Sequence, residues 1–268
     1  MLPSKVTLFA AVALTTLCLC HAGDIHNPRK GRIVGGTVAY PAQFPFMAAI
    51  TIQTSISRIF CVGVLLNNQW ILTAAHCING AVLITIQIGS NSLSQADSNR
   101  LTLATSTYVV HPEFNPETIE HDVGLIKLRL AVDFTDYIRA TSYLPSSPIV
   151  AYQSVQAVGW GQISDVDVTL SDELRWVLLS AISNEECRLT YGAQITDTMV
   201  CASGNYNEGP CLGDSGGPLI HVQDGGRVEI VAVASFVSAN GCESADPSGY
   251  TRTYPYVNWI RNVTDIWD

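Results

Sequence analysis

Residues 213–218 of this 268-residue chain read Gly-Asp-Ser-Gly-Gly-Pro, and this stretch carries the strongest chemical signal in the sequence. A serine hydroxyl is a weak nucleophile at neutral pH unless a base lies beside it. The glycines leave room for a substrate around Ser215. They also allow successive backbone N–H groups to converge on the oxygen of a carbonyl under attack. The stretch therefore predicts a nucleophilic serine.

Two further motifs supply the partners that such a serine needs. Residues 70–77 read WILTAAHC, in which His76 directly precedes Cys77 and is held in place if that cysteine is bridged. Residues 121–128 read HDVGLIKL, in which Asp122 opens an apolar run. A buried aspartate is costly unless it is hydrogen-bonded, and a histidine N–H would satisfy it. We therefore expect His76, Asp122 and Ser215 to converge.

The serine motif also fits G-x-S-x-G, the nucleophile elbow of α/β-hydrolases. In that class the acid and then the histidine follow the serine along the chain. The only histidine after Ser215 is His221, which lies in an apolar, strand-like run. The elbow also requires helices that alternate with strands, and the sequence does not show them.

Short apolar or alternating runs, each bounded by Gly, Asn, Pro or Ser, occur along the whole chain. This pattern predicts an all-β fold, a sandwich or barrels. The last stretch, residues 254–267, has apolar residues at helical spacing. The predicted strands are 46–52, 60–66, 70–74, 82–88, 101–110, 123–130, 155–158, 174–182, 199–202, 218–222, 228–236 and 249–253.

Composition excludes several classes of protein. The chain is 47% hydrophobic and only 14% charged, so it can bury a large core. Its formal net charge of -9 argues against nucleic acid or an anionic membrane as a partner. The sequence lacks C-x-x-C and H-E-x-x-H motifs, and residues 89–100 contain a single acid, Asp97. We therefore predict no metal site, neither zinc nor calcium, and no cofactor.

The N-terminus has the features of a secretory signal. Lys5 precedes a nearly unbroken apolar run over residues 6–20, and Ala22 offers a small-residue cleavage site. The run is shorter than the roughly 20 residues of a membrane span, so a signal peptide (1–22) is favoured over an uncleaved anchor. A polar pro-segment (23–32) follows. Six cysteines then remain, which predicts a secreted, extracellular protein with three disulfides, although spacing cannot choose their pairing.

Four motifs, in order, resemble the chymotrypsin/trypsin family of serine peptidases: IVGG at 33–36, TAAHC at 73–77, DVGLI at 122–126 and GDSGGP at 213–218. The resemblance covers 33–268. It implies two six-stranded antiparallel β-barrels, roughly 33–140 and 141–268, with a short C-terminal helix and an active site in the cleft between the barrels. It also implies a serine endopeptidase that works through an acyl-enzyme.

The resemblance assigns a role to each motif residue. Ser215 is the nucleophile, His76 takes its proton and returns it to the leaving amine, and Asp122 orients His76. The N–H groups of Gly213 and Ser215 form the oxyanion hole, and Ser235 borders the buried aspartate. The implied disulfides are Cys61–Cys77, Cys187–Cys201 and Cys211–Cys242.

Activation is also implied. Cleavage between Arg32 and Ile33 would free an amino group at Ile33 that pairs with Asp214. Such a partner would offset the cost of burying Asp214, so the precursor is expected to be inactive.

Pocket residues suggest the side chain that is accepted before the scissile bond (P1). Gly209 stands where trypsin-like members have an aspartate, so Arg and Lys are not favoured. Val237 and Ser248 occupy wall positions, and Val237 narrows the entrance as in elastase-like members. We predict small or medium apolar P1 residues, with a chymotrypsin-like preference as the next alternative. Phe236 replaces a frequent tryptophan, and Asp246 is close enough in sequence to reach the pocket.

The sequence departs from the family at Val62, where glycine is common, and at Gly124, where alanine is usual. Expected partners are protein or peptide substrates, an activating trypsin-like protease and protein protease inhibitors, and a monomer is expected. The competing class is a non-catalytic binding protein on the same fold. A simple digestive role is favoured over a proteolytic cascade. His111 and His121 are interpreted as loop histidines, and Asn262 begins a glycosylation sequon.

Overall fold

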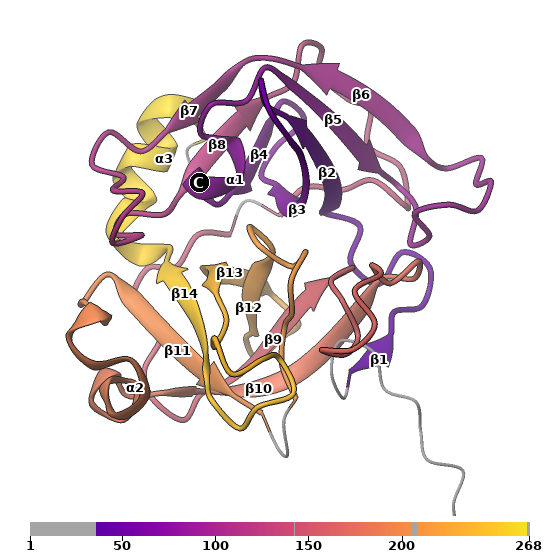
Figure 1. The fold of residues 1–268 in the computed structure, drawn as a ribbon. Coiled ribbons are helices and arrows are strands. Elements are labelled where there is room, and N and C mark those ends of the chain that lie inside the picture. The colour runs from indigo at the N-terminus through magenta and orange to yellow at the C-terminus, as the bar shows by residue number, and fades with distance from the viewer. Residues whose placement is uncertain (1–35, 142, 205–207, 267–268) are drawn as a thin grey trace, which may run out of the picture. The chain divides into compact units, whose positions relative to one another are not determined.

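A computed structural model describes residues 36–141, 143–204 and 208–266, and these residues form two β-sheets, each of seven strands (Figure 1). Every strand pairing among them is antiparallel. The predicted signal peptide and pro-segment, with Arg32 and Ile33, lie outside the described residues. Within the described ranges, no helix is both long and apolar enough to cross a membrane.

The first sheet runs in the order β6-β5-β2-β3-β4-β8-β7. The predicted strand 101–110 is in fact two strands, because 101–105 pairs with β5 and 108–110 pairs with β8. At the break, the Thr105 hydroxyl accepts from the N–H of Thr107 (3.1 Å) and donates to the carbonyl of Lys127 (2.8 Å). The strands are β2 (Met47–Gln53), β3 (Arg58–Leu65), β4 (Trp70–Thr73), β5 (Leu83–Ile88), β6 (Leu101–Thr105), β7 (Tyr108–Val110) and β8 (Gly124–Lys127).

The second sheet runs in the order β1-β10-β11-β14-β13-β12-β9, and β9 also pairs with β10. That extra pairing closes a ring of six strands, to which β1 is added from the other end of the chain. The strands are β1 (Thr37–Val38), β9 (Ser154–Gly159), β10 (Arg175–Ile182), β11 (Met199–Ser203), β12 (Pro218–Val222), β13 (Val228–Phe236) and β14 (Ser248–Arg252). The predicted all-β fold with two barrels is therefore confirmed; the additional strands are β1 and the divided run.

The helices are short and sit at the edges of the sheets. The predicted C-terminal helix is present as a 3-10 turn, η2 (Tyr254–Tyr256), followed by α3 (Val257–Thr264). Its Ile260 is fully buried in the core of the first sheet, so the C-terminal helix packs on that sheet, beside β7 (Figure 1). Helix α2 (Asn184–Tyr191) was not predicted. The sequence carried its signal, a capping box in which Ser183 and Glu186 bond each other's backbone N–H groups.

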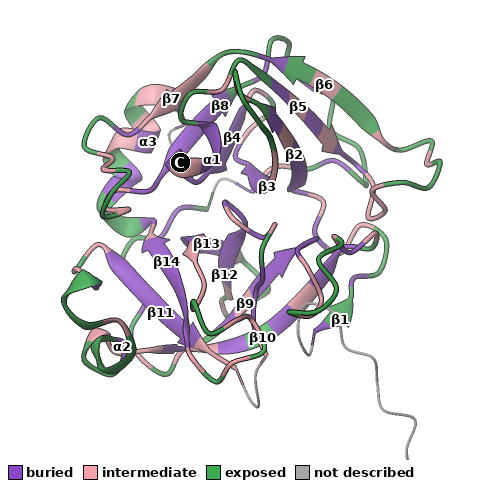
Figure 2. Ribbon diagram, in the orientation of Figure 1, coloured by how far each residue is buried: buried purple, intermediate pink, exposed green. Residues whose placement is uncertain are grey.

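Two apolar clusters fill the barrels, and the buried strands stand out in Figure 2. The first cluster includes Ile50, Leu72 and Ile86 and also takes in Ile220 and Val233 of the second sheet. The two sheets are therefore packed on each other through apolar contacts. The second cluster lies within the closed ring; it includes Val155, Leu179, Leu219, Val231 and Tyr250.

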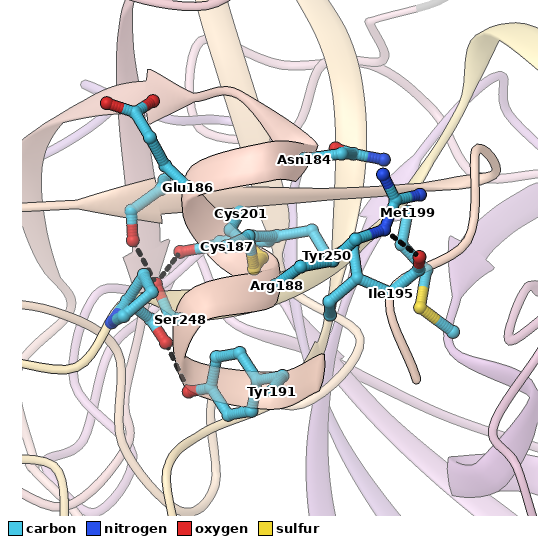
Figure 3. Close-up of a disulfide and its surroundings, with 12 residues drawn as sticks. Asn184, Glu186, Cys187, Arg188, Tyr191, Ile195, Met199, Cys201, Ser248 and Tyr250 are labelled. Carbon is cyan, nitrogen blue, oxygen red and sulfur yellow. Dashed lines mark hydrogen bonds between the residues drawn. A yellow bond between two sulfur atoms is a disulfide. The ribbon is translucent and has the colours of Figure 1, made fainter. Parts of the chain in front are cut away.

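The described residues contain three disulfides, Cys61–Cys77, Cys187–Cys201 and Cys211–Cys242. They are the pairs that the family resemblance implied. The first ties α1 (Ala75–Ile78) to β3. The second ties α2 to β11, beside Ser248 and Tyr250 of β14 (Figure 3).

Candidate active site

Strand register brings His76 and Asp122 together. Thr73 at the end of β4 is paired with Gly124 at the start of β8, so the residues just beyond these strand ends lie side by side. His76 Nδ1 is 2.7 Å from Asp122 Oδ2, and the backbone N–H of His76 donates to Oδ1 at 2.8 Å. Two residues that are 46 positions apart in sequence therefore form one hydrogen-bonded pair.

Asp122 is fully buried, and its third partner comes from the other sheet. The hydroxyl of Ser235, near the end of β13, donates to Asp122 Oδ2 at 2.5 Å. Burying a carboxylate is costly unless its oxygens are hydrogen-bonded, and three donors meet that need here. The side chain of His76 remains 30% exposed, so the pair has one buried end and one end open to substrate.

Ser215 sits in a tight turn immediately before β12. Gly213 and Gly216 on either side of the serine have φ of 99° and 79°, which favours glycine. A Cβ at Gly216 would also collide with the Thr73 hydroxyl and the Val62 carbonyl. The N–H of Val62 in β3 donates to the carbonyl of Ser215 at 2.8 Å, which links the serine turn to the first sheet.

The turn leaves two backbone donors open. Among the hydrogen bonds of the described residues, the N–H groups of Gly213 and Ser215 have no protein acceptor, whereas those of Asp214, Gly216 and Gly217 do. In the same set, no hydrogen bond joins Ser215 Oγ to His76, and His76 Nε2 lies 3.7 Å from Cys77 Sγ. The structure thus brings His76, Asp122 and Ser235 into direct contact and places Ser215 through backbone contacts alone.

Asp214 is a buried carboxylate, 3% exposed, whose oxygens accept the N–H groups of Gly161 (2.7 Å) and Cys211 (2.9 Å). Burial raises its pKa to about 6, and the two backbone hydrogen bonds partly oppose that rise. No cationic side chain within the described ranges forms an ion pair with it. Gly159 and Gly161 make room for the carboxylate, since a Cβ at either position would overlap it. These glycines were not predicted to belong to the site; their signal in the sequence is the Gly-x-Gly at 159–161.

A cavity of about 200 Å³ opens beside Ser215. Of the predicted pocket residues, it is lined by Ser235, Phe236 and Val237. Gly209 and Ser248 instead border a neighbouring cavity of about 10 Å³, which Val237 also lines. The predicted pocket residues are therefore divided between two adjoining spaces.

Asp246 borders the smaller cavity, together with Gly209 and Ser248. Its carboxylate accepts the Ser238 hydroxyl (2.6 Å) and the Asn240 amide (2.7 Å). The hydrogen bond from Ser238, more than that from Asn240, holds the pKa of Asp246 below its usual value. These two hydrogen bonds hold the Asp246 carboxylate at the rim of the smaller cavity.

Two departures from the family, Gly124 and Phe236, have local explanations. A Cβ at Gly124 would lie 2.7 Å from the Ile78 side chain, so glycine accommodates the isoleucine. Phe236 packs edge-on against Tyr191, with ring centroids 5.1 Å apart, and its ring occupies the space that a side chain at Gly249 would need. His221 Nδ1 hydrogen-bonds the carbonyl of Ser154, and this contact joins β12 to β9.

Comparison with known proteins decides the family. The family profile described as Trypsin matches residues 33–260, which is most of the chain. The chain belongs to the trypsin family. It is a serine-type endopeptidase of chymotrypsin fold, so the α/β-hydrolase alternative was wrong.

Relatives of this trypsin-family chain include proteins with different names. It is 36% identical over 234 residues to brachyurin of Leptuca pugilator, covering 87% of this chain and 99% of that protein. It is 35% identical over 266 residues to a collagenase of Hypoderma lineatum, covering 97% of each. It is 31% identical over 241 residues to human chymotrypsin-like elastase family member 1, covering 87% of this chain and 93% of that protein. A solved structure of HL collagenase superposes with a TM-score of 0.78 at 33% identity, covering 88% of this chain and 100% of that one.

Proposed function

We propose that this chain is the precursor of a secreted endopeptidase that cleaves after small or medium apolar residues, with His76, Asp122 and Ser215 as its triad. The observation that carries the proposal is the buried Asp122 carboxylate, which receives donors from His76 and Ser235 beside the Ser215 turn. An aspartate held in this way fixes one tautomer of the imidazole, with the proton on Nδ1. Nε2 is then left as a base.

In the first half of the reaction, Ser215 Oγ attacks the carbonyl carbon of the substrate while His76 Nε2 accepts the hydroxyl proton. A rotation of the serine side chain toward His76 completes this contact when substrate binds. The carbonyl oxygen becomes an oxyanion and accepts the two open N–H groups of Gly213 and Ser215. The C–N bond then breaks as His76 returns the proton to the leaving amine.

In the second half, water replaces the amine. His76 takes a proton from water, the resulting hydroxide attacks the acyl carbon, and the second oxyanion uses the same two donors. On collapse the bond between the acyl carbon and Ser215 Oγ breaks, His76 gives its proton to Oγ, and the carboxylic acid leaves. Asp122 stays ionised throughout and stabilises the charged form of His76.

Activation is proposed to depend on Asp214. Its buried carboxylate has backbone donors but no cation among the described residues, and its raised pKa reflects that cost. An amino group released at Ile33 would supply the missing charge and lower that pKa. Arg32 calls for an activating protease of trypsin-like specificity, because an enzyme with an apolar pocket does not cut efficiently after arginine.

Replacing Arg32 with glutamine is expected to yield a precursor that trypsin no longer activates. The reason is that trypsin needs a cationic P1 residue, and Asp214 then never gains its partner. Peptidase activity after trypsin treatment, followed with N-terminal sequencing, measures the effect. Arg58→Gln, an exposed arginine on β3, is the matched control and should be activated normally. Normal activation of the Arg32 variant would place the processing site elsewhere.

The proposed specificity rests on the cavity beside Ser215. Val237 lines it, and the lining contains no charged side chain except Asp214, whose oxygens are already bonded. Gly209 adds no charge to the adjoining cavity, but Glu208 and Asp246 border it, and Asp246 is bound by Ser238 and Asn240. The cavity beside Ser215, narrowed by a branched side chain, favours small and medium apolar P1 residues. The relatives named collagenase and elastase have similar sequence identities to this chain. The proposed P1 preference therefore rests on the pocket more than on their names.

Val237→Gly is expected to raise kcat/KM for substrates with Phe at P1 relative to Ala by about 10-fold or more, since a few methyl groups in an apolar pocket discriminate on that scale. The measurement is cleavage of a peptide library after trypsin treatment, with the trypsin then blocked by a lysine/arginine-directed inhibitor. Val166→Gly, at a 91% exposed loop position, is the control. An unchanged Phe-to-Ala ratio would contradict the role of Val237, and cleavage after Arg by the wild type would mean that Asp246 reaches the substrate.

Secretion, a digestive role, protein protease inhibitors as partners and a monomeric state stay predictions from the sequence. Asn262 is exposed on α3, as glycosylation of its sequon requires.

A further inference from the structure

Three groups of potential metal ligands occur among the described residues, and only one contains no disulfide cysteine. Two of the groups contain cysteines that are joined in disulfides, namely Cys61 with Cys77 and Cys211 with Cys242. A disulfide sulfur offers no thiolate to a metal. The third group is His111, Glu113 and His121.

The β7–β8 pairing brings the two histidines together. Val110 is opposite Gly124, and the N–H of His111 donates to the carbonyl of Val123 at 3.1 Å. His111 therefore leaves β7 at the point where His121 approaches β8. Their rings stack with centroids 5.5 Å apart and an interplanar angle of 17°. Nine residues of loop lie between them, so no local sequence motif marks the pair.

Aromatic side chains pack against both histidine rings. His111 is 8% exposed and lies edge-on to Tyr256 and Trp259, with ring centroids 4.9 Å away in each case. His121 Nδ1 is 2.9 Å from the hydroxyl of Tyr256, a hydrogen bond of the kind that orients a histidine for metal binding. His111 Nδ1 accepts the backbone N–H of Glu113 at 3.3 Å, a long hydrogen bond that a zinc ion at this nitrogen would replace. Glu113 is exposed, so its side chain can change rotamer without displacing packed residues.

We propose that His111, Glu113 and His121 form a zinc site at the base of the β7–β8 loop, with water as the fourth ligand. Their ligand atoms all lie within 4.8 Å of one another. A tetrahedral zinc ion with bonds of about 2.1 Å needs neighbouring ligands about 3.4 Å apart, so shifts on the order of 1 Å close the site. Two imidazoles and a carboxylate select zinc over calcium or magnesium, which prefer oxygen ligands.

The sequence predicted no metal site, so this proposal differs from that expectation. The proposal does not depend on the proposed function. It would lie one residue before Asp122. A bound ion would clamp the two ends of the loop that leads into the acid of the proposed triad.

Zinc binding to the Ser215→Ala precursor tests the proposal, because this variant cannot digest itself. Competition with a chromophoric zinc chelator is expected to show one high-affinity zinc ion per chain. The Tm should rise by several degrees once free zinc exceeds the dissociation constant about 100-fold.

Variants distinguish this site from binding elsewhere. Glu113→Gln and His121→Asn should each weaken binding at least about 10-fold and, at the same free zinc, cut the Tm rise by about half or more. Asparagine tolerates the φ of 56° at position 121, so that variant should fold. Glu117→Gln, an exposed carboxylate in the same loop, is the matched control and should bind zinc like the parent. Absence of saturable zinc binding, or unchanged affinity in the two ligand variants, would overturn the proposal.

Discussion

Ser215→Ala is expected to reduce kcat at least about 10⁴-fold, with secretion and folding unchanged. Only the hydroxyl group is lost. Among the described residues this hydroxyl makes no hydrogen bond, so its removal should not lower the stability of the fold. The turn itself is held by backbone contacts, including the one between the N–H of Val62 and the carbonyl of Ser215. The measurement is hydrolysis of a chromogenic peptide by the trypsin-treated protein, with Tm as the test of folding.

A second serine variant separates the loss of a nucleophile from the loss of any hydroxyl. Ser180→Ala removes a half-buried hydroxyl on β10 that makes one weak contact, 3.5 Å to the carbonyl of Ala181. Its kcat should match the wild type. Labelling with a serine-directed phosphonate should be lost in Ser215→Ala alone. Turnover retained by Ser215→Ala would refute the assigned nucleophile.

Asp122→Asn is expected to lower kcat by about 10⁴-fold at neutral pH, as in the Ser-His-Asp template. An amide placed at Oδ2 would present N–H groups to Ser235 Oγ and His76 Nδ1, both of which donate to the carboxylate now. His76 would then adopt the tautomer with its proton on Nε2 and cease to act as a base. Stability should also fall, because the position is fully buried.

The pH profile of kcat/KM checks this prediction, since a changed tautomer alters the profile and a purely structural loss does not. Asp172→Asn is the matched control. Asp172 also accepts several hydrogen bonds, from Ser92 Oγ (2.8 Å) and the N–H of Ser94 (2.7 Å), on another loop. It should lose stability without losing the activity of its folded fraction. Comparable kcat in Asp122→Asn and the wild type would remove Asp122 from the triad.

Much of the fold was predictable because its signals are local. Each strand of the second sheet that the sequence predicted is present within a residue or two, since alternating apolar residues and flanking turn residues act over a few positions. Helix α2 was not predicted, although Ser183 and Glu186 form a capping box at its start. Its only buried residue is Cys187, so its sequence shows no apolar periodicity. Strand β1 has two residues and no apolar pattern, and it forms because Thr37 and Val38 meet the edge of β10.

The sequence by itself determined which residues are the candidates for catalysis. His76, Asp122 and Ser215 each lie in a contiguous motif, and the glycines beside Ser215 express a backbone need that is local to the turn. Tertiary structure alone decided what those residues meet. The hydroxyl of Ser235 reaches Asp122, Gly159 and Gly161 enclose Asp214, and His111 stacks on His121. Such contacts depend on strand register and on the packing of one sheet against the other, which join residues far apart in the chain and leave no mark in the order of neighbouring residues.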